Sequence, residues 1–290
     1  MASNGIIVID KPQGWTSMDI CAKLRGMYRE KRVGHAGTLD PMATGVLPVF
    51  IGRATRAVEF ASEGEKEYVA GLKLGVITNT QDTSGEVLET RPVNVTPEQL
   101  EEALAKFRGD IEQIPPMYSA IKINGKKLYE LARKGKEVER KPRPVTIHAL
   151  NVEEQTAPDE FTIRVRCSKG TYVRTLCHDI GQTLGCGGTM SSLRRTMAAG
   201  FDLSQSVSLE DVQNHPQREE LLLPVDAYFS TYPSLTVDAS AEKKIRNGMT
   251  LVMPQLVPGQ YRVYGGDGSF LALCRAEQGK LITVKSFFEV

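Results

Sequence analysis

The sequence predicts an α+β protein with a large, mainly antiparallel mixed sheet flanked by helices, followed by a small second domain rich in β-strands. Strand-like and helix-like segments are mixed without the repeating strand–helix–strand unit that builds a parallel sheet. Beyond about residue 229, short strands separated by turn residues surround one short helix. A chain of 290 residues can bury one large core and a small one. We therefore expect a first domain over residues 1–228 and a second over residues 229–290.

The first third of the chain is expected to begin with a buried strand over the apolar residues 5–9. Thr16 or Ser17 then caps a helix whose apolar face places similar side chains three or four positions apart. Those side chains are Ile20, Cys21, Leu24 and Met27. A strand, a helix and a strand are expected next, in that order, at 46–51, 53–62 and 67–76.

In the middle of the chain, the sequence TPEQ at 96–99 has the form of a capping box with proline at the first helical position. It predicts a helix over 97–108. Residues 118–123 and the Asn124-Gly125 pair predict a strand and a tight turn, followed by a short amphipathic helix. Residues 145–152 and 161–167 alternate between apolar and polar, so they are expected to pair in an antiparallel sheet.

The remaining elements follow from helix periodicity and turn residues. A helix is expected over 172–184, where Gly185 ends it, and a partly helical stretch over 208–223. A short helix is expected over 239–246. The turn GGDG at 265–268 is expected to join two strands in a hairpin, at 261–264 and 270–274.

Composition narrows the class of protein. The net charge is +1, so any nucleic-acid binding must depend on local positive charge. The five cysteines are an odd number without a disulfide framework, which favours a reducing cytoplasm. The apolar run at 6–9 is too short for a signal peptide, and no stretch has the length of a membrane span. We expect a soluble cytoplasmic protein.

Local positive charge is concentrated between residues 122 and 143, where nine Lys and Arg face three Glu, a net of +6. Lys126, Lys127 and Arg133 belong to this segment. A solvated amphipathic hairpin would also carry such charges, but an excess of this size is typical of an element that contacts phosphates.

A glycine-punctuated loop carries the strongest signal for chemistry. Between residues 33 and 52 only His35 and Asp40 can titrate. An Asp-Pro pair usually marks a helix N-cap, but Gly45 and Pro48 would end such a helix within about one turn. A carboxylate among apolar neighbours needs a cationic partner to stay ionised. The loop therefore indicates a carboxylate placed for chemistry.

The same loop, GHAGTLDPMATG at 34–45, resembles the catalytic loop of the TruB family of tRNA pseudouridine synthases. Further motifs in the family's order extend the resemblance over roughly residues 5 to 200. They are DKPQGWTS at 10–17, KEY at 66–68, QIPPMYSA at 113–120 and CSKGTYVR at 167–174.

The resemblance implies a pseudouridine-synthase core with a basic, thumb-like insertion at about 118–144, and a PUA-like RNA-binding domain at 229–290. The implied reaction isomerises uridine to pseudouridine at position 55 in the TΨC loop of tRNA, by base flipping and attack of an aspartate. The implied partner is tRNA, bound through its TΨC arm and its acceptor stem. No obligate protein partner is implied.

The resemblance assigns catalytic roles to three residues. Asp40 corresponds to the nucleophile, and Arg174 to the arginine that pairs with it. A bidentate guanidinium would keep the carboxylate ionised and oriented. Tyr68 corresponds to a tyrosine that stacks on the target base and is the favoured acceptor of the proton at carbon 5. Because a neutral phenol is a poor base at pH 7, a purely stacking role stays open.

Further residues are expected to contact the substrate or support the site. By resemblance, His35 helps to hold the flipped conformation of the RNA loop, and Leu193 packs against the base, although plain core packing would explain Leu193 equally well. Tyr172, in the same motif as Arg174, is also expected at the substrate. Asp82 is expected to tune hydrogen bonds, and Lys11 to support either the strand of Tyr68 or the loop.

No cofactor or metal is expected, because the chain has no phosphate-binding glycine loop, and Cys177, His178 and Cys186 lack the spacing of a zinc site. Two alternatives from the residues stay open: a non-catalytic chaperone that folds tRNA, and a synthase that acts on another RNA.

Overall fold

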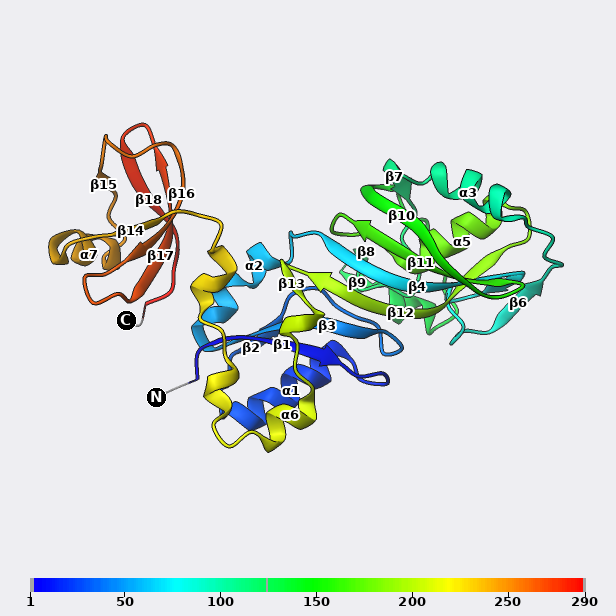
Figure 1. Ribbon diagram of the computed structural model, residues 1–290, viewed down its shortest axis with the longest axis horizontal. Coiled ribbons are helices and arrows are strands. Elements are labelled where there is room, and N and C mark those ends of the chain that lie inside the picture. Colours follow the sequence, from blue (N-terminus) through cyan, green and yellow to red (C-terminus); the bar gives the residue numbers. More distant parts are fainter. Residues whose placement is uncertain (1–2, 124, 289–290) are drawn as a thin grey trace.

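The computed structural model describes residues 3–123 and 125–288. Its main feature is a nine-stranded sheet, made in chain order of β1 (Gly5–Lys11), β2 (Val33–His35), β3 (Thr44–Ile51), β4 (Lys66–Leu74), β7 (Gly109–Gln113), β10 (Arg143–Ala157), β11 (Glu160–Cys167), β12 (Gly188–Ala198) and β13 (Phe201–Asp202). The path across the sheet is β1-β3-β12-β4-β11-β10-β7, with β2 paired to β3 and β13 to β12. Only β3 and β12 pair in parallel among these described strands. The predicted mainly antiparallel mixed sheet is confirmed (Figure 1).

Helices cover the two halves of this sheet separately (Figure 1). Helices α3 (Pro97–Ala105) and α5 (Val173–Thr183) pack against β4, β10 and β11, and their Leu104 and Leu176 are fully buried there. Helices α1 (Ser17–Tyr28) and α6 (Leu209–Asn214) pack against β1 and β3. The apolar spacing of each helix therefore buries one face on the sheet.

Capping residues set the helix starts that the sequence predicts. The Thr16 side chain accepts from the Asp19 backbone N–H at 3.1 Å and begins α1, so Thr16 rather than Ser17 is the cap. Thr96 caps α3 in the same way. The helix predicted over 53–62 is split into the 3₁₀ helix η1 (Gly52–Ala57) and the single-turn helix α2 (Val58–Ala61).

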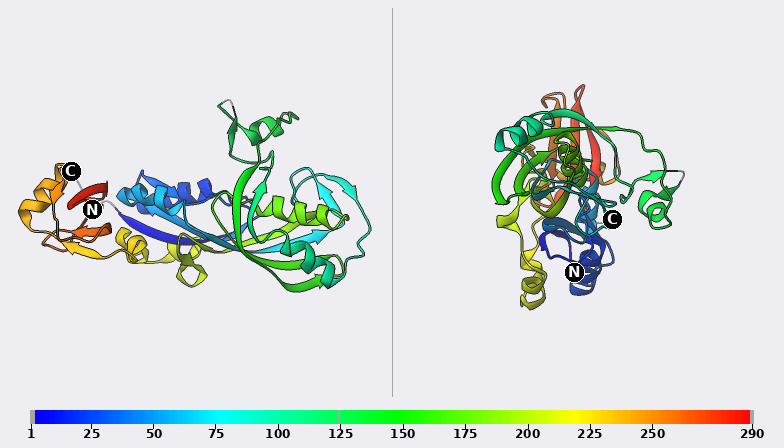
Figure 2. Two further views of the ribbon diagram at one scale, coloured as in Figure 1. Left: turned by 90° about the horizontal axis from the view of Figure 1, so that it is seen from above. Right: turned by 90° about the vertical axis from the view of Figure 1, so that its right-hand side faces the viewer.

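The predicted insertion projects from the sheet as an arm (Figure 2). It contains the short strands β8 (Lys122–Ile123) and β9 (Lys126–Lys127) and the helix α4 (Leu128–Ala132). The strand predicted over 118–123 covers only its last two residues, because backbone N–H groups of α4 donate to the carbonyls of Ser119 and Ile121 and fold that stretch into turns. Asn124, in the predicted tight turn, lies outside the described residues.

Strand β12 has no counterpart among the elements that the sequence predicts, although it lies in the middle of the sheet. It pairs with β4 on one side, and on the other side Arg194 and Arg195 align with Thr44 and Gly45 of β3. This central position brings residues from β3, β4 and β12 into register next to the loop that contains Asp40.

The C-terminal region forms a separate five-stranded sheet (Figure 1). Its strands are β14 (Ser234–Thr236), β15 (Leu251–Val252), β16 (Gly259–Tyr264), β17 (Phe270–Glu277) and β18 (Lys280–Ser286), joined by helix α7 (Ala239–Arg246). The predicted helix at 239–246 and the predicted hairpin are both present. Shorter elements complete the chain: β5 (Val76–Thr78), β6 (Val87–Thr90), η2 (Leu203–Gln205), η3 (Arg218–Leu221) and η4 (Val225–Phe229).

Candidate active site

Asp40 lies in the loop between β2 and β3, where it starts a tight turn and no helix follows. The Ala43 backbone N–H donates to the Asp40 carbonyl at 3.0 Å. Lys11, fully buried at the end of β1, donates from Nζ to the carbonyl oxygens of Ala43 at 2.6 Å and Pro41 at 3.4 Å. Burial lowers the pKa of Lys11 to about 8. Of the two supports predicted for Lys11, the structure therefore shows contact with the loop.

Arg174 pairs with Asp40, from the first turn of α5. Its Nη2 lies 3.0 Å from Asp40 Oδ2, and its side chain is 7% exposed against 39% for Asp40. The same Nη2 donates to the Tyr118 carbonyl at 2.9 Å, and Nη1 donates to the Thr80 carbonyl at 3.0 Å. Nη2 is the nitrogen that meets Asp40, in place of the expected bidentate grip, because Nη1 donates to a backbone carbonyl and Nε faces Asp82. Arg174 therefore holds Asp40 from the buried side, and the other side of the Asp40 carboxylate stays exposed to solvent.

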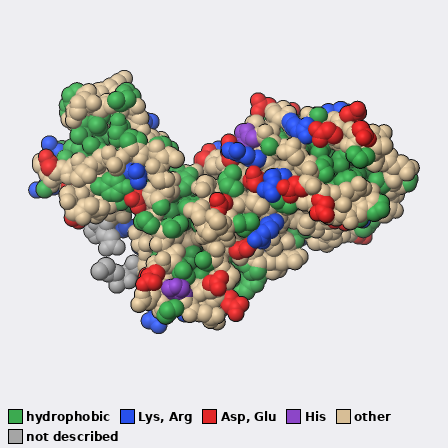
Figure 3. Space-filling view, in the orientation of Figure 1, with side chains coloured by type: hydrophobic (Ala, Val, Ile, Leu, Met, Phe, Trp, Pro, Cys, Tyr) green, Lys and Arg blue, Asp and Glu red, His purple; other side chains and the backbone are tan. Residues whose placement is uncertain are grey.

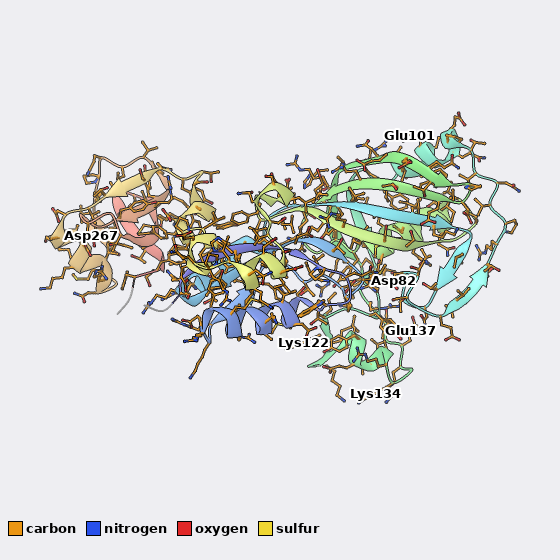
Figure 4. The ribbon with its side chains drawn as sticks, turned by 60° about the horizontal axis from the view of Figure 1, so that its bottom comes forward. Asp82, Glu101, Lys122, Lys134, Glu137 and Asp267 are labelled. Carbon is orange, nitrogen blue, oxygen red and sulfur yellow. The ribbon has the colours of Figure 1, made fainter. Side chains whose placement is uncertain are left out.

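Asp82 lies on the other side of the same guanidinium, with Oδ2 3.7 Å from Arg174 Nε. Its Oδ1 accepts from the Thr80 hydroxyl at 2.8 Å and from the Ser84 backbone N–H at 3.0 Å. The buried Asp82 therefore orders the loop that supplies the Thr80 carbonyl to Arg174. Figure 4 labels Asp82 close to the base of the projecting arm.

Tyr68 lies on β4 and is 7% exposed. Burial raises the pKa of its hydroxyl, and the neighbouring guanidinium of Arg195 opposes that rise. Leu193, half-buried on β12, packs against the same core cluster as Tyr68. Asp40 makes a smaller contribution that also raises the pKa of Tyr68.

The other predicted contacts are divided between this site and the arm. His35 lies on β2, and burial, with a smaller effect from Arg195, lowers its pKa. Tyr172 directly precedes α5 and donates its backbone N–H to Gln113 Oε1 at 3.0 Å. Lys126, Lys127 and Arg133 lie in the arm, at β9 and beside α4.

Arg195 is a residue of this site that sequence reasoning missed. It is fully buried on β12, and it donates from Nε to the Val46 carbonyl at 2.7 Å and from Nη2 to the Gly37 carbonyl at 3.0 Å. These two carbonyls stand on either side of Asp40 in the chain. Adjacent residues of a strand point to opposite faces, so one of Arg194 and Arg195 faces inward once β12 is known to be a strand, but the sequence did not predict that strand.

Gly45 allows β12 to approach the loop. Its φ is +100°, and a Cβ at this position would lie 2.2 Å from the Arg195 carbonyl oxygen. Any other residue would force β3 and β12 apart, and with them the two halves of the site.

No group of three or more His, Cys, Asp or Glu within the described ranges is placed to hold a metal ion. Cys177 and Cys186 are buried with free thiols. Among the same residues, no helix is long and apolar enough to cross a membrane.

Comparison with known proteins gives matches over nearly the whole chain. Residues 25–173 match the N-terminal domain of the TruB family pseudouridylate synthases, and residues 174–230 match the C-terminal domain of tRNA pseudouridylate synthase B. A tRNA pseudouridine synthase B from Clostridium kluyveri is 41% identical over 98% of this chain and 99% of its own length. The chain belongs to the TruB family of tRNA pseudouridine synthases. It is therefore an enzyme that isomerises uridine to pseudouridine in tRNA.

Other relatives support the same family. A tRNA pseudouridine synthase B from Ralstonia pickettii is 46% identical over 90% of this chain and 85% of its own length. Among solved structures, a chain of a Cbf5–Nop10–Gar1 complex has a TM-score of 0.75 at 25% identity, and covers 99% of this TruB-family chain and 86% of its own. A chain of the archaeal box H/ACA sRNP Nop10–Cbf5 complex has a TM-score of 0.73 at 24% identity over 99% of this chain and 87% of its own, which supports the fold.

Proposed function

We propose that this enzyme modifies uridine 55, in the TΨC loop of tRNA, and that Asp40 is its nucleophile. The observation that carries the assignment of Asp40 is its pairing with the buried Arg174 while its own carboxylate is 39% exposed. A nucleophilic carboxylate has to be held in place and reachable, and the pairing and the exposure of Asp40 support both. The choice of position 55 rests on the resemblance of the loop.

A uridine in a folded loop is stacked, so it must be flipped out before Asp40 can reach its sugar or base. Asp40 then attacks at C1′ and releases uracil, or the reaction passes through a glycal intermediate. In both routes the detached base rotates, a bond forms between C5 and C1′, and the proton on C5 leaves. Tyr68 either accepts that proton or only stacks on the base.

The substrate contacts also belong to this proposal. Leu193 and Tyr172 pack against the flipped base, and His35 holds the RNA loop in its opened form. Lys126, Lys127 and Arg133 bind phosphates of the TΨC arm, and the C-terminal region reaches the acceptor stem. The cytoplasmic location, the independence from a protein partner and the lack of a cofactor stay predictions from the sequence.

The Asp40→Asn variant tests the nucleophile. We expect kcat to fall by about 1000-fold or more, because the amide cannot form the covalent bond, while the RNA dissociation constant changes little. Tritium release from C5-labelled uridine in a TΨC stem-loop measures turnover, and filter binding measures affinity.

Two controls make this experiment specific. Asp159→Asn removes a partly exposed carboxylate that pairs with Lys73, and should keep full activity. A stem-loop with cytidine at position 55 and labelled uridines elsewhere should release no tritium. Multiple turnover by Asp40→Asn would refute the assignment, whereas a chaperone that folds tRNA without chemistry would keep its function in that variant.

A further inference from the structure

Arg195 is a buried cation that the proposed reaction has not yet used. Its side chain is 0% exposed, and no carboxylate within residues 3–123 and 125–288 lies within ion-pair distance of it. Two of its three nitrogens donate to the carbonyls of Gly37 and Val46, and Nη1 has no hydrogen-bond partner among the described residues. A buried charged donor without a partner is costly, so its presence calls for a reason.

The register of the sheet places Arg195 beside Tyr68. In the pairing of β12 with β4, Arg195 lies directly opposite Tyr68, and in the pairing with β3 it lies opposite Gly45. Directly opposite residues project their side chains on the same face of a sheet. The guanidinium therefore contacts the loop of Asp40 through the Val46 and Gly37 carbonyls and lies on the same face of the sheet as the Tyr68 phenol, whose pKa it lowers.

We propose that Arg195 is a positioning residue with two effects on pseudouridine formation. Its Nε and Nη2 brace the loop on both sides of Asp40, and its Nη1 stabilises negative charge on the Tyr68 oxygen. The second effect rests on the proposed role of Tyr68 as the base, and it selects that role over stacking alone.

The proton transfer begins at the Tyr68 hydroxyl, which loses its proton to water. The phenolate oxygen that remains is stabilised by the Arg195 guanidinium. After C5 has bonded to C1′, the phenolate accepts the proton on C5 and becomes a phenol again. The electron pair of the broken C5–H bond restores the double bond between C5 and C6, the electron pair of the C6–N1 double bond moves to N1, and N1 takes a proton from water.

Burial raises the pKa of Tyr68, and three neighbouring groups also affect it. Arg195 on β12 lowers this pKa, while Cys167 on β11 and Asp40 in the loop raise it. The Cys167 thiol itself has its pKa raised to about 11 by burial, so it is neutral near pH 7. Removing the charge of Arg195 should therefore make the phenolate form only at higher pH.

Two substitutions separate the two effects. Arg195→Lys keeps a charge but cannot donate to both carbonyls, so we expect kcat to fall by about 10-fold with an unchanged pH profile. Arg195→Met removes both, so we expect a loss of about 100-fold and a rising limb of the pH profile displaced upward by about one unit or more. A stem-loop deuterated at C5 of the target uridine should show a larger isotope effect with Arg195→Met than with wild type.

The comparison with Tyr68→Phe decides whether Arg195 acts through the tyrosine. If it does, the double variant Arg195→Met with Tyr68→Phe should have a kcat lower than that of Tyr68→Phe only by the factor seen with Arg195→Lys, which reports the lost hydrogen bonds to the loop. Arg194→Met is the matched control, because the neighbouring arginine is 42% exposed and pairs with Asp10. Its isotope effect and pH profile should equal those of wild type.

Several outcomes would overturn the proposal. Equal losses with Lys and Met, without a change in pH profile or isotope effect, would mean that Arg195 only braces the fold. If Arg195→Met fails to fold, a near wild-type kcat in Arg195→Lys would still show that the hydrogen bonds from Arg195 to the Gly37 and Val46 carbonyls do not position Asp40. Full activity of Tyr68→Phe would by itself refute the role of Tyr68 as the base. These measurements can use any uridine that the enzyme converts, so they do not depend on the proposal that the target is position 55.

Discussion

Arg174 shows how one side chain can order several parts of a site at once. Its Nη2 serves both Asp40 and the Tyr118 carbonyl, and its Nη1 serves the Thr80 carbonyl. The planar guanidinium holds these partners at fixed angles, whereas a lysine offers one compact ammonium. The carboxylate of Asp40 is therefore oriented by a group that is itself anchored in two loops.

We expect Arg174→Lys to lower kcat by about 100-fold, because a lysine nitrogen placed at Asp40 leaves the Thr80 and Tyr118 carbonyls without their donor. Tritium release from the stem-loop measures this rate, and a thermal unfolding curve shows whether the fold is kept. Arg164→Lys, at a partly exposed arginine that pairs with Glu67 and Glu153, is the control. A rate within about threefold of wild type would show that charge alone is sufficient.

Single residues of the site differ in how far the sequence could predict them. Asp40 could be found because glycines and prolines around a lone carboxylate exclude the usual capping role, and Arg174 because a motif placed it at a helix start. Arg195 could not, because its burial depends on the register of a strand against two others. The single contact between Arg174 and Asp40 also depends on loops that meet only in the folded chain.

At the scale of elements, the arm that contains β8, β9 and α4 contrasts with the sheet surface seen in Figure 3, where positive and negative side chains are interspersed. Arginines on the sheet surface form ion pairs, as Arg166 does with Glu65. In the arm, Lys122, Lys126 and Lys134 are exposed and take part in no ion pair within the described residues. Figure 4 shows Lys122 and Lys134 on the projecting part. Unpaired cations on a projecting element are suited to phosphates.

Replacing four arm cations, Lys126, Lys127, Arg133 and Lys134, by alanine should weaken tRNA binding and reduce its salt dependence. The slope of log Kd against log salt concentration should fall by about one unit for each phosphate that the variant no longer neutralises. Binding measured across a salt series gives this slope. A variant that replaces the paired Arg91, Arg164, Arg166 and Arg275 by alanine removes the same charge and should keep the slope. Equal slopes for wild type and the arm variant would show a solvated surface.

Elements with regular patterns could be predicted, while the central strand could not. The alternation of 145–152 and 161–167 correctly indicated the pairing of β10 with β11. Strand β12 carries Ser191, Ser192, Arg194 and Thr196 in its middle, so neither alternation nor an apolar run marks it. Some of these polar side chains bond to neighbouring strands, as when Thr196 donates to Glu67 at 2.8 Å. A strand whose side chains serve a site loses the pattern that would reveal it.

At the scale of the whole molecule, the C-terminal sheet is packed onto the catalytic part through aromatic rings. Phe229, in η4, has its ring 5.6 Å from that of Phe60 and 5.7 Å from that of Phe287. Lys285 also pairs with Glu59 at 2.5 Å. The boundary predicted at 228/229 falls inside η4, and the two-domain division and the PUA-like character stay predictions. Deleting the C-terminal region would expose this cluster, so a deletion would mix loss of binding with loss of stability.

A substitution on helix α7 tests the proposed reach to the acceptor stem without disturbing that packing. Asp238 caps the helix, and Lys243 and Lys244 are exposed in its last turn, whereas Arg246 pairs with Glu242. We expect Lys243→Ala combined with Lys244→Ala to raise KM for full-length tRNA by roughly 3- to 10-fold with kcat unchanged, because contacts to phosphates far from the reacting base affect binding alone. On the isolated TΨC stem-loop, which has no acceptor stem, the variant should behave as wild type. Equal changes on both substrates would place these lysines against the TΨC arm instead, and no change on either would leave α7 a solvated surface.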